Sequence, residues 1–138
     1  MNKEQQKKLG LWLASKQWQP WARGTNDCCT LFMEYHDHMF GTDTVSSIYG
    51  KYNDLRSAIK LRKEFPTVNE WFPDHGYHSV LKPQTGDIVM VEQRYFPSSY
   101  IICMNQAWGL TDDSKRMTKH IINEPAAEYS IWRHEEWD

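Results

Sequence analysis

The stretch GTNDCCTLF, residues 24–32, decides the fold because it contains the start of a helix. Asp27 is a good N-cap, since its carboxylate can accept hydrogen bonds from the free backbone N–H groups of the first turn. Apolar residues then recur at helical spacing, at Cys28, Leu31, Phe32, Tyr35 and Met39. We therefore expect a central helix over residues 27–40 that ends at Gly41, with Cys28 at its N-terminus on the inward face.

Cys28 stands where a reactive thiol would sit. The free N–H groups and the positive end of the helix dipole favour the thiolate over the thiol. Core packing is the other interpretation, because cysteine is among the most buried residue types. Cys29 shares a second apolar face with Met33, His36 and Phe40, and we interpret it as packing.

The glycine-containing loop and the Asp27-Cys28 pair belong to an ordered set of motifs. The later members are Phe40-Gly41-Thr42-Asp43, Tyr49-Gly50-Lys51-Tyr52 and Gly86-Asp87-Ile88-Val89. Over residues 18–133 this set resembles a phage-borne family of NlpC-like domains, within the superfamily of papain-like cysteine peptidases. The resemblance implies a cysteine helix packed on an antiparallel sheet, with Cys28 as the nucleophile of a peptidoglycan-cleaving ancestor.

The chain departs from this family at the histidine. A cysteine hydrolase needs an imidazole within hydrogen-bond reach of its thiol. In the superfamily that histidine opens the strand after the Gly-Asp strand, where this chain has Ser98-Ser99-Tyr100. His120, on a neighbouring predicted strand, is the best substitute base, and His75 and His78 are alternatives in the loop before the sheet.

The order of elements predicts an α+β fold in a single domain, residues 1–138. We expect an N-terminal helix over residues 1–16, the central helix, a helical segment over 53–73 and a loop over 73–83. An antiparallel sheet of about five strands should follow over residues 87–133. The expected strands are Asp87–Gln93, Tyr100–Met104, Ala107–Leu110, Arg116–Ile122 and Glu128–Arg133.

Composition excludes several kinds of site. A net charge of −2 argues against nucleic acid as the main partner. Three cysteines without a Cys-x-x-Cys pattern predict neither a disulfide framework nor a zinc site. Glu34, His36 and His38 are two residues apart on a helix, so their side chains point in different directions and cannot bind one ion. We therefore expect no metal and no cofactor. No apolar run approaches the roughly 20 residues of a membrane span, and we expect a chain made soluble in the host cytoplasm.

Aromatic residues make up 14% of the chain, and aromatic residues fill cores and dominate protein interfaces. We expect Trp21 and Tyr49 beside the cleft of Cys28, and Trp132 and Trp137 as contacts to partners. Three hypotheses follow. The chain is a virion component of the phage tail or head-to-tail assembly on a degenerate hydrolase fold, among other virion proteins and in multiple copies. Alternatively, it is an active Cys28-dependent peptidoglycan hydrolase, or an assembly module outside the virion.

Overall fold

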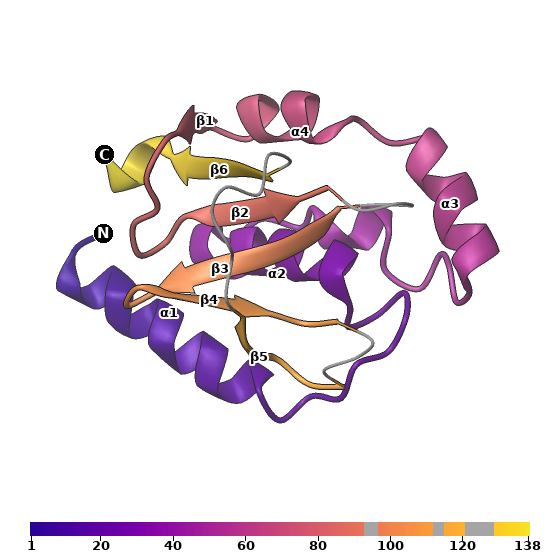
Figure 1. Cartoon of the computed structure of the whole chain (residues 1–138), viewed down its shortest axis with the longest axis horizontal. Coiled ribbons are helices and arrows are strands. Elements are labelled where there is room, and N and C mark those ends of the chain that lie inside the picture. The colour runs from indigo at the N-terminus through magenta and orange to yellow at the C-terminus, as the bar shows by residue number, and fades with distance from the viewer. Residues whose placement is uncertain (93–96, 112–114, 121–128) are drawn as a thin grey trace.

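The computed structural model describes residues 1–92, 97–111, 115–120 and 129–138. In these residues the main helices come first and the sheet follows, so the fold is α+β as expected (Figure 1). The helical elements are α1 (Lys3–Lys16), α2 (Cys28–Phe40), η1 (Val45–Ser47), α3 (Leu55–Lys63), α4 (Val68–Asp74) and the C-terminal η2 (Glu135–Trp137). The strands are β1 (Tyr77–Val80), β2 (Ile88–Val91), β3 (Ser98–Cys103), β4 (Gln106–Gly109), β5 (Thr118–His120) and β6 (Tyr129–His134).

The described strands form one antiparallel sheet in the order β1-β6-β2-β3-β4-β5. The five expected strands correspond to β2 through β6, and the expected strand residues 93, 121, 122 and 128 lie outside the described part of the chain. The expectation of a loop over residues 73–83 is wrong in part, because β1 lies within it and pairs with β6 from Tyr77↔His134 to Val80↔Ile131. Its four residues are too few to show an alternating pattern, so pairing with β6 defines this strand.

The helices begin at caps that the sequence supplies. Asn2, Asp27, Asp54 and Thr67 each form a reciprocal capping box at the start of a helix. Gly41 ends α2 with a φ of +68°, a left-handed conformation that glycine adopts without strain. The helical segment expected over residues 53–73 is two helices, α3 and α4. They are separated near Pro66, which restricts the residue before it and cannot donate a backbone hydrogen bond.

Helix α2 is the centre of the molecule. It lies behind β2 and β3 in Figure 1. Its residues Leu31 and Tyr35 are fully buried, and the Tyr35 hydroxyl donates to the Gly86 carbonyl at 2.7 Å. Trp12 of α1 packs 5.7 Å from the Tyr35 ring, and Trp71 of α4 meets Phe32 edge-on at 4.9 Å. Other elements therefore cover α2 on three sides. Among the described helices, none is both long enough and apolar enough to cross a membrane.

The Gly86-Asp87 pair holds the start of β2 in place. Asp87 is fully buried and binds the Arg133 guanidinium of β6 through two hydrogen bonds of 2.8 and 3.0 Å. Gly86 has a φ of +99° and its backbone nitrogen donates to Ile102 at 2.8 Å. The pair therefore joins the start of β2 to both of its neighbouring strands.

Candidate functional site

Asp27 is the centre of a polar network at the N-terminus of α2. Its carboxylate accepts from the backbone nitrogens of Gly24, Cys29 and Thr30 at 2.8 to 3.0 Å, and from the Tyr52 hydroxyl at 2.7 Å. The residue is 4% exposed. A buried carboxylate with this many donors fixes the start of the helix and the loop before it.

The loop before α2 is held against the connection that carries Tyr52. Gly24 has a φ of +90°, and a Cβ atom there would lie 1.8 Å from the Tyr52 carbonyl oxygen. Gly50 closes the contact by donating its backbone N–H to the Gly24 carbonyl at 2.9 Å. Only glycine fits at position 24, so this motif residue places the thiols next to Tyr52.

Cys28 faces the sheet, and the residue opposite it is a serine. Cys28 is 9% exposed and shares the inward face of α2 with Leu31 and Tyr35. The hydroxyl of the fully buried Ser99, near the start of β3, donates to the Cys28 carbonyl at 2.6 Å. The NlpC-like resemblance predicts a histidine at this strand start. The structure has Ser99 there, and its hydroxyl bonds the backbone of Cys28 and not the thiol.

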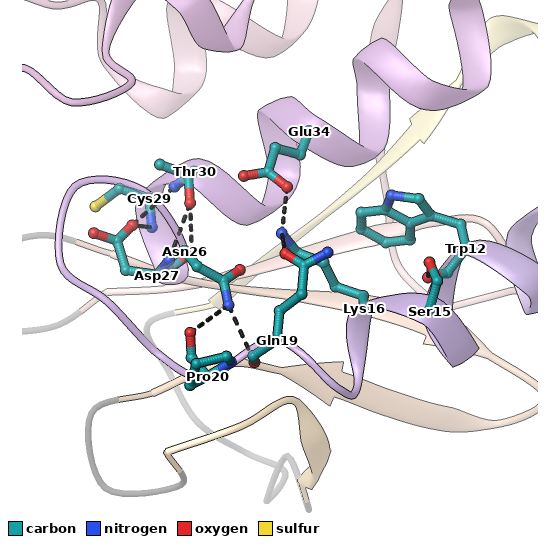
Figure 2. A network of polar contacts seen from close by, with 10 residues as sticks. All are labelled: Trp12, Ser15, Lys16, Gln19, Pro20, Asn26, Asp27, Cys29, Thr30 and Glu34. Carbon is teal, nitrogen blue, oxygen red and sulfur yellow. Dashed lines mark hydrogen bonds and ion pairs between the residues drawn. The ribbon is translucent and has the colours of Figure 1, made fainter.

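Cys29 points to a different side of the helix from Cys28. Its sulfur lies beside the Asp27 carboxylate, away from the Lys16–Glu34 ion pair (Figure 2). A hydrogen bond with Cys28, burial, and the nearby charge of Asp27 raise the pKa of the Cys29 thiol well above its ordinary value. Cys29 is therefore a neutral thiol at physiological pH and a poor nucleophile.

Tyr100 and His120 lie on the opposite face of the sheet from α2. The two rings meet edge-on at 5.1 Å, and His120 Nε2 lies 3.3 Å from the Thr118 hydroxyl. Burial raises the pKa of the Tyr100 phenol, and the nearby Cys28 raises it further. A phenol that stays protonated cannot act as a general base, so Tyr100 is not a base for Cys28. His120 packs on Tyr100, on the face of the sheet away from α2, and so does not face the thiol.

Three other histidines meet near the C-terminal end of α2. The rings of His75 and His134 lie 5.6 and 6.0 Å from that of His36, and the Tyr77 hydroxyl lies 2.9 Å from His36 Nδ1. Burial, and then repulsion by His75, lower the pKa of His36 to about 4. His36 is eight residues from Cys28, which is about 12 Å along a helix axis. His38 stacks on Trp12, and His78 pairs with Asp138 at 3.4 Å.

None of these positions brings an imidazole within hydrogen-bond distance of the Cys28 sulfur among the residues that the structure describes. The described residues also contain no group of three or more His, Cys, Asp or Glu side chains that could hold a metal ion. The site therefore consists of a capped thiol without an imidazole partner.

A second polar group joins α1 to α2 beside this site (Figure 2). Lys16 is 2% exposed and pairs with Glu34, while its ammonium group also donates to Gln19 at 3.3 Å. Asn26 donates to the carbonyl oxygens of Gln19 and Pro20 at 3.2 and 2.8 Å. These contacts fix the loop between the two helices and provide no base for Cys28.

The four expected binding aromatics fall into two groups. Trp21 is half-buried under the Arg23 guanidinium at 5.2 Å, and Tyr49 is 53% exposed. Trp132 stacks on Phe72 at 5.0 Å and Trp137 stacks on Phe40 at 5.1 Å, and both tryptophans are buried. As placed, Trp132 and Trp137 build the core and offer no surface to a partner, whereas Tyr49 does.

Sequence reasoning missed the partners that matter most at this site. Tyr52 and Ser99 lie 25 and 71 residues away from the residues they bind, and their types carry no catalytic signal. The Tyr49-Gly50-Lys51-Tyr52 motif contained Tyr52, but nothing in the sequence indicated that its hydroxyl binds Asp27.

Comparison with known proteins gives a family and no function. No curated protein and no solved structure matches this chain. One family model, described as a domain of unknown function, matches residues 2–129, which is nearly all of the sequence. The chain belongs to the DUF6950 family.

Proposed function

We propose that this chain is a non-catalytic structural module on a degenerate NlpC-like fold, and that it serves in a phage virion as a tail or head-to-tail component. The observation that carries the non-catalytic part is the hydroxyl of Ser99 at the Cys28 carbonyl, 2.6 Å away, on the strand that should present an imidazole. The virion part rests on the resemblance of the ordered motifs to phage-borne domains. In this proposal the chain is made in the host cytoplasm and then joins other virion proteins.

The motif residues support a structural role because their contacts are internal. Asp27 uses its carboxylate to cap α2 and to hold Tyr52, and Asp87 uses its carboxylate to hold Arg133. Gly24 permits a close approach to the Tyr52 backbone, and Gly86 has a left-handed φ of +99° beside the Met1 side chain. A fold can keep such residues after its chemistry is lost, because removing them costs stability whatever the function.

Alkylation by iodoacetamide tests the non-catalytic part. Tandem mass spectrometry of tryptic peptides resolves Cys28, Cys29 and Cys103, because fragmentation separates the adjacent Cys28 and Cys29 of one peptide. The urea-unfolded chain provides the intrinsic rate of each thiol. We expect folded Cys28 to react at pH 7 more slowly than unfolded Cys28, since it is 9% exposed and no hydrogen bond or ion pair joins its sulfur to a cation in the described part of the chain. A folded rate ten times the unfolded rate or more would contradict the proposal.

The alternative, a peptidoglycan hydrolase, is favoured by the placement of Cys28 at the capped N-terminus of α2. Release of soluble peptides from purified peptidoglycan separates the two functions. We expect no release by the wild type above the level of Cys28→Ser. Cys28-dependent release would establish the hydrolase and overturn the structural proposal.

The virion assignment has its own test. Purified particles, treated with protease to remove adsorbed protein and then analysed by quantitative mass spectrometry, should contain the chain at a fixed copy number. Its absence from particles, together with its presence in the infected cell, would favour the third hypothesis of an assembly module outside the virion.

A further inference from the structure

A histidine ring joins the C-terminal η2 to the rest of the domain. His134, the last residue of β6, is the N-cap of η2, and its Nδ1 atom accepts from the Glu136 backbone nitrogen at 3.1 Å. The same ring stacks on Phe40 of α2 at 4.0 Å. Trp137 of η2 is buried and also stacks on Phe40. His134 therefore fixes both the start of η2 and one side of the surface on which Trp137 lies.

These contacts determine which nitrogen of the His134 ring carries the proton. A backbone N–H can only donate, so Nδ1 is an acceptor and the proton of the neutral ring lies on Nε2. Nε2 lies against Gly76, where a Cβ atom would be 2.8 Å from it, and the ring forms a backbone hydrogen bond with His75. A second proton would have to enter at Nδ1, where the Glu136 N–H already points. Two donors cannot share one hydrogen bond, so the charged ring loses the cap.

Two other imidazoles lie close to this ring. His36 is 6.0 Å from His134 and 5.6 Å from His75, and we name these three residues the imidazole cluster. Burial lowers the pKa of His134, and burial followed by repulsion from His75 lowers the pKa of His36. The closed cluster is therefore a neutral cluster, and protons bind to it less readily than to free imidazoles.

Other titratable groups also face the imidazole cluster or η2. They are Asp37 and Tyr35 of α2, Tyr77 and His78 of β1, and Glu135, Glu136 and Asp138 at the C-terminal end. Burial lowers the pKa of His134 more than these last three carboxylates raise it. Burial also raises the pKa of both tyrosines, so neither phenol ionises near neutral pH. A charged His78 would attract Asp138, 3.4 Å away, and so oppose the loss of η2.

We propose that His134 is an acid-sensitive cap of η2: a proton on Nδ1 breaks the cap, η2 leaves the domain, and Trp137 and Phe40 become exposed. The pKa of His134 is lower in the closed form than the ordinary 6.5, so the open form binds more protons and opening is favoured as the pH falls below 6.5. One proton taken up on opening changes the ratio of open to closed chains by up to about tenfold per pH unit, and a second on His36 by up to about a hundredfold. This proposal goes beyond the structural role and does not depend on it.

Fluorine NMR of the chain, with 5-fluorotryptophan at its seven tryptophan positions, tests the opening. Single Trp→Phe variants identify the resonances. Between pH 7.5 and 5.0 we expect the Trp137 signal to move towards that of the exposed Trp18, while the signal of Trp132, buried in the core, keeps its position. A Trp137 signal that stays unchanged means that η2 does not open, and one that changes only together with Trp132 means global unfolding. Either result overturns the proposal.

His134→Asn separates the cap from the charge. The asparagine side chain can accept from the Glu136 N–H but takes up no proton, so we expect the pH dependence of opening to fall by about tenfold per pH unit relative to the wild type. The matched control is His38→Asn, because His38 is an exposed imidazole of the same helix α2 and stacks on Trp12. Equal pH dependence in His134→Asn and the wild type would refute the role of His134.

Nitrogen NMR of the imidazole rings reads the proton without a substitution. The ¹⁵N shifts distinguish the two neutral tautomers from each other and from the imidazolium. We expect His134 to be the Nε2–H tautomer at pH 7.5 and an imidazolium in the open form. An Nδ1–H tautomer at pH 7.5, or an imidazolium while Trp137 is still buried, overturns the proposal even if His134→Asn fails to fold.

Discussion

The two ends of α2 divide between them the groups that a cysteine hydrolase brings together. The N-terminal end has Cys28 and the buried carboxylate of Asp27, with no imidazole in reach. The C-terminal end has His36 in contact with two further imidazoles, and no thiol. A thiol and an imidazole, the two groups of a catalytic pair, are thus both present but lie towards opposite ends of α2. The residues at the N-terminal end cap the helix, and those at the C-terminal end pack the core.

This separation shows why composition is a poor guide to chemistry. Six histidines in 138 residues make a thiol–imidazole pair plausible from the sequence. A catalytic pair needs a contact of about 3 Å, and the rise of about 1.5 Å per residue carries His36 far from the thiol. Four substitutions test how differently the two ends work, from the largest expected effect to the smallest.

Asp27→Ala should have the largest effect, because it leaves three buried donors and one part-buried donor without their acceptor. We expect a loss of about 3–5 kcal/mol in the free energy of unfolding, measured by urea denaturation. The control is Asp54→Ala, which removes the exposed cap of α3 and should cost about 1 kcal/mol. Equal losses would show that Asp27 is an ordinary cap.

Trp137→Ala should be the most damaging change at the other end of α2. It removes a buried ring that stacks on Phe40, and we expect a loss of about 3–4 kcal/mol by the same measurement. Trp137→Phe keeps a ring stacked on Phe40 and should cost about 1 kcal/mol. A small effect of the alanine variant would mean that η2 does not stabilise the domain.

The histidine end should make stability depend on pH. Because the pKa of His36 falls from its ordinary 6.5 to about 4 on folding, the unfolded chain binds more protons than the native chain between these values. Stability is therefore lost as the pH falls from 6.5 towards 4, by up to roughly 3 kcal/mol from His36.

Urea denaturation at pH 7.0, 6.0 and 5.0 measures this loss. His36→Phe should reduce the difference between the first and the last pH, and the exposed His78→Phe should not. The pKa of His134, also lowered by burial, adds to the same trend in both variants. Identical pH dependence in wild type and His36→Phe would show that His36 is not the group responsible.

Ser99→Ala should have the smallest effect of the four. It removes one buried hydrogen bond to the Cys28 carbonyl, and we expect a loss of about 1 kcal/mol with no rise in Cys28 alkylation at pH 7. Ser79→Ala, on the exposed side of β1, is the control and should be close to neutral. Faster alkylation of Cys28 in Ser99→Ala would show that Ser99 restrains a thiol that is otherwise reactive.

By itself, the sequence determined the elements that depend on local chemistry. Asp27 and Gly41 set the limits of α2, the capping pairs set the starts of the other helices, and the change from helical to alternating spacing set the α+β order. The sequence also showed that Ser98-Ser99-Tyr100 has no histidine. These features follow from a few neighbouring residues, whose backbone preferences are strong enough to act alone.

Only the tertiary structure decided what depends on distant contacts. Strand β1 exists because β6 pairs with it, Trp132 and Trp137 are core residues because Phe72 and Phe40 lie beside them, and Tyr52 reaches Asp27 across 25 residues. The same packing put His120 on the far face of the sheet from α2 and gathered His36, His75 and His134 near the C-terminal end of the helix, away from Cys28. Such contacts depend on the relative position of whole elements, which no local pattern encodes.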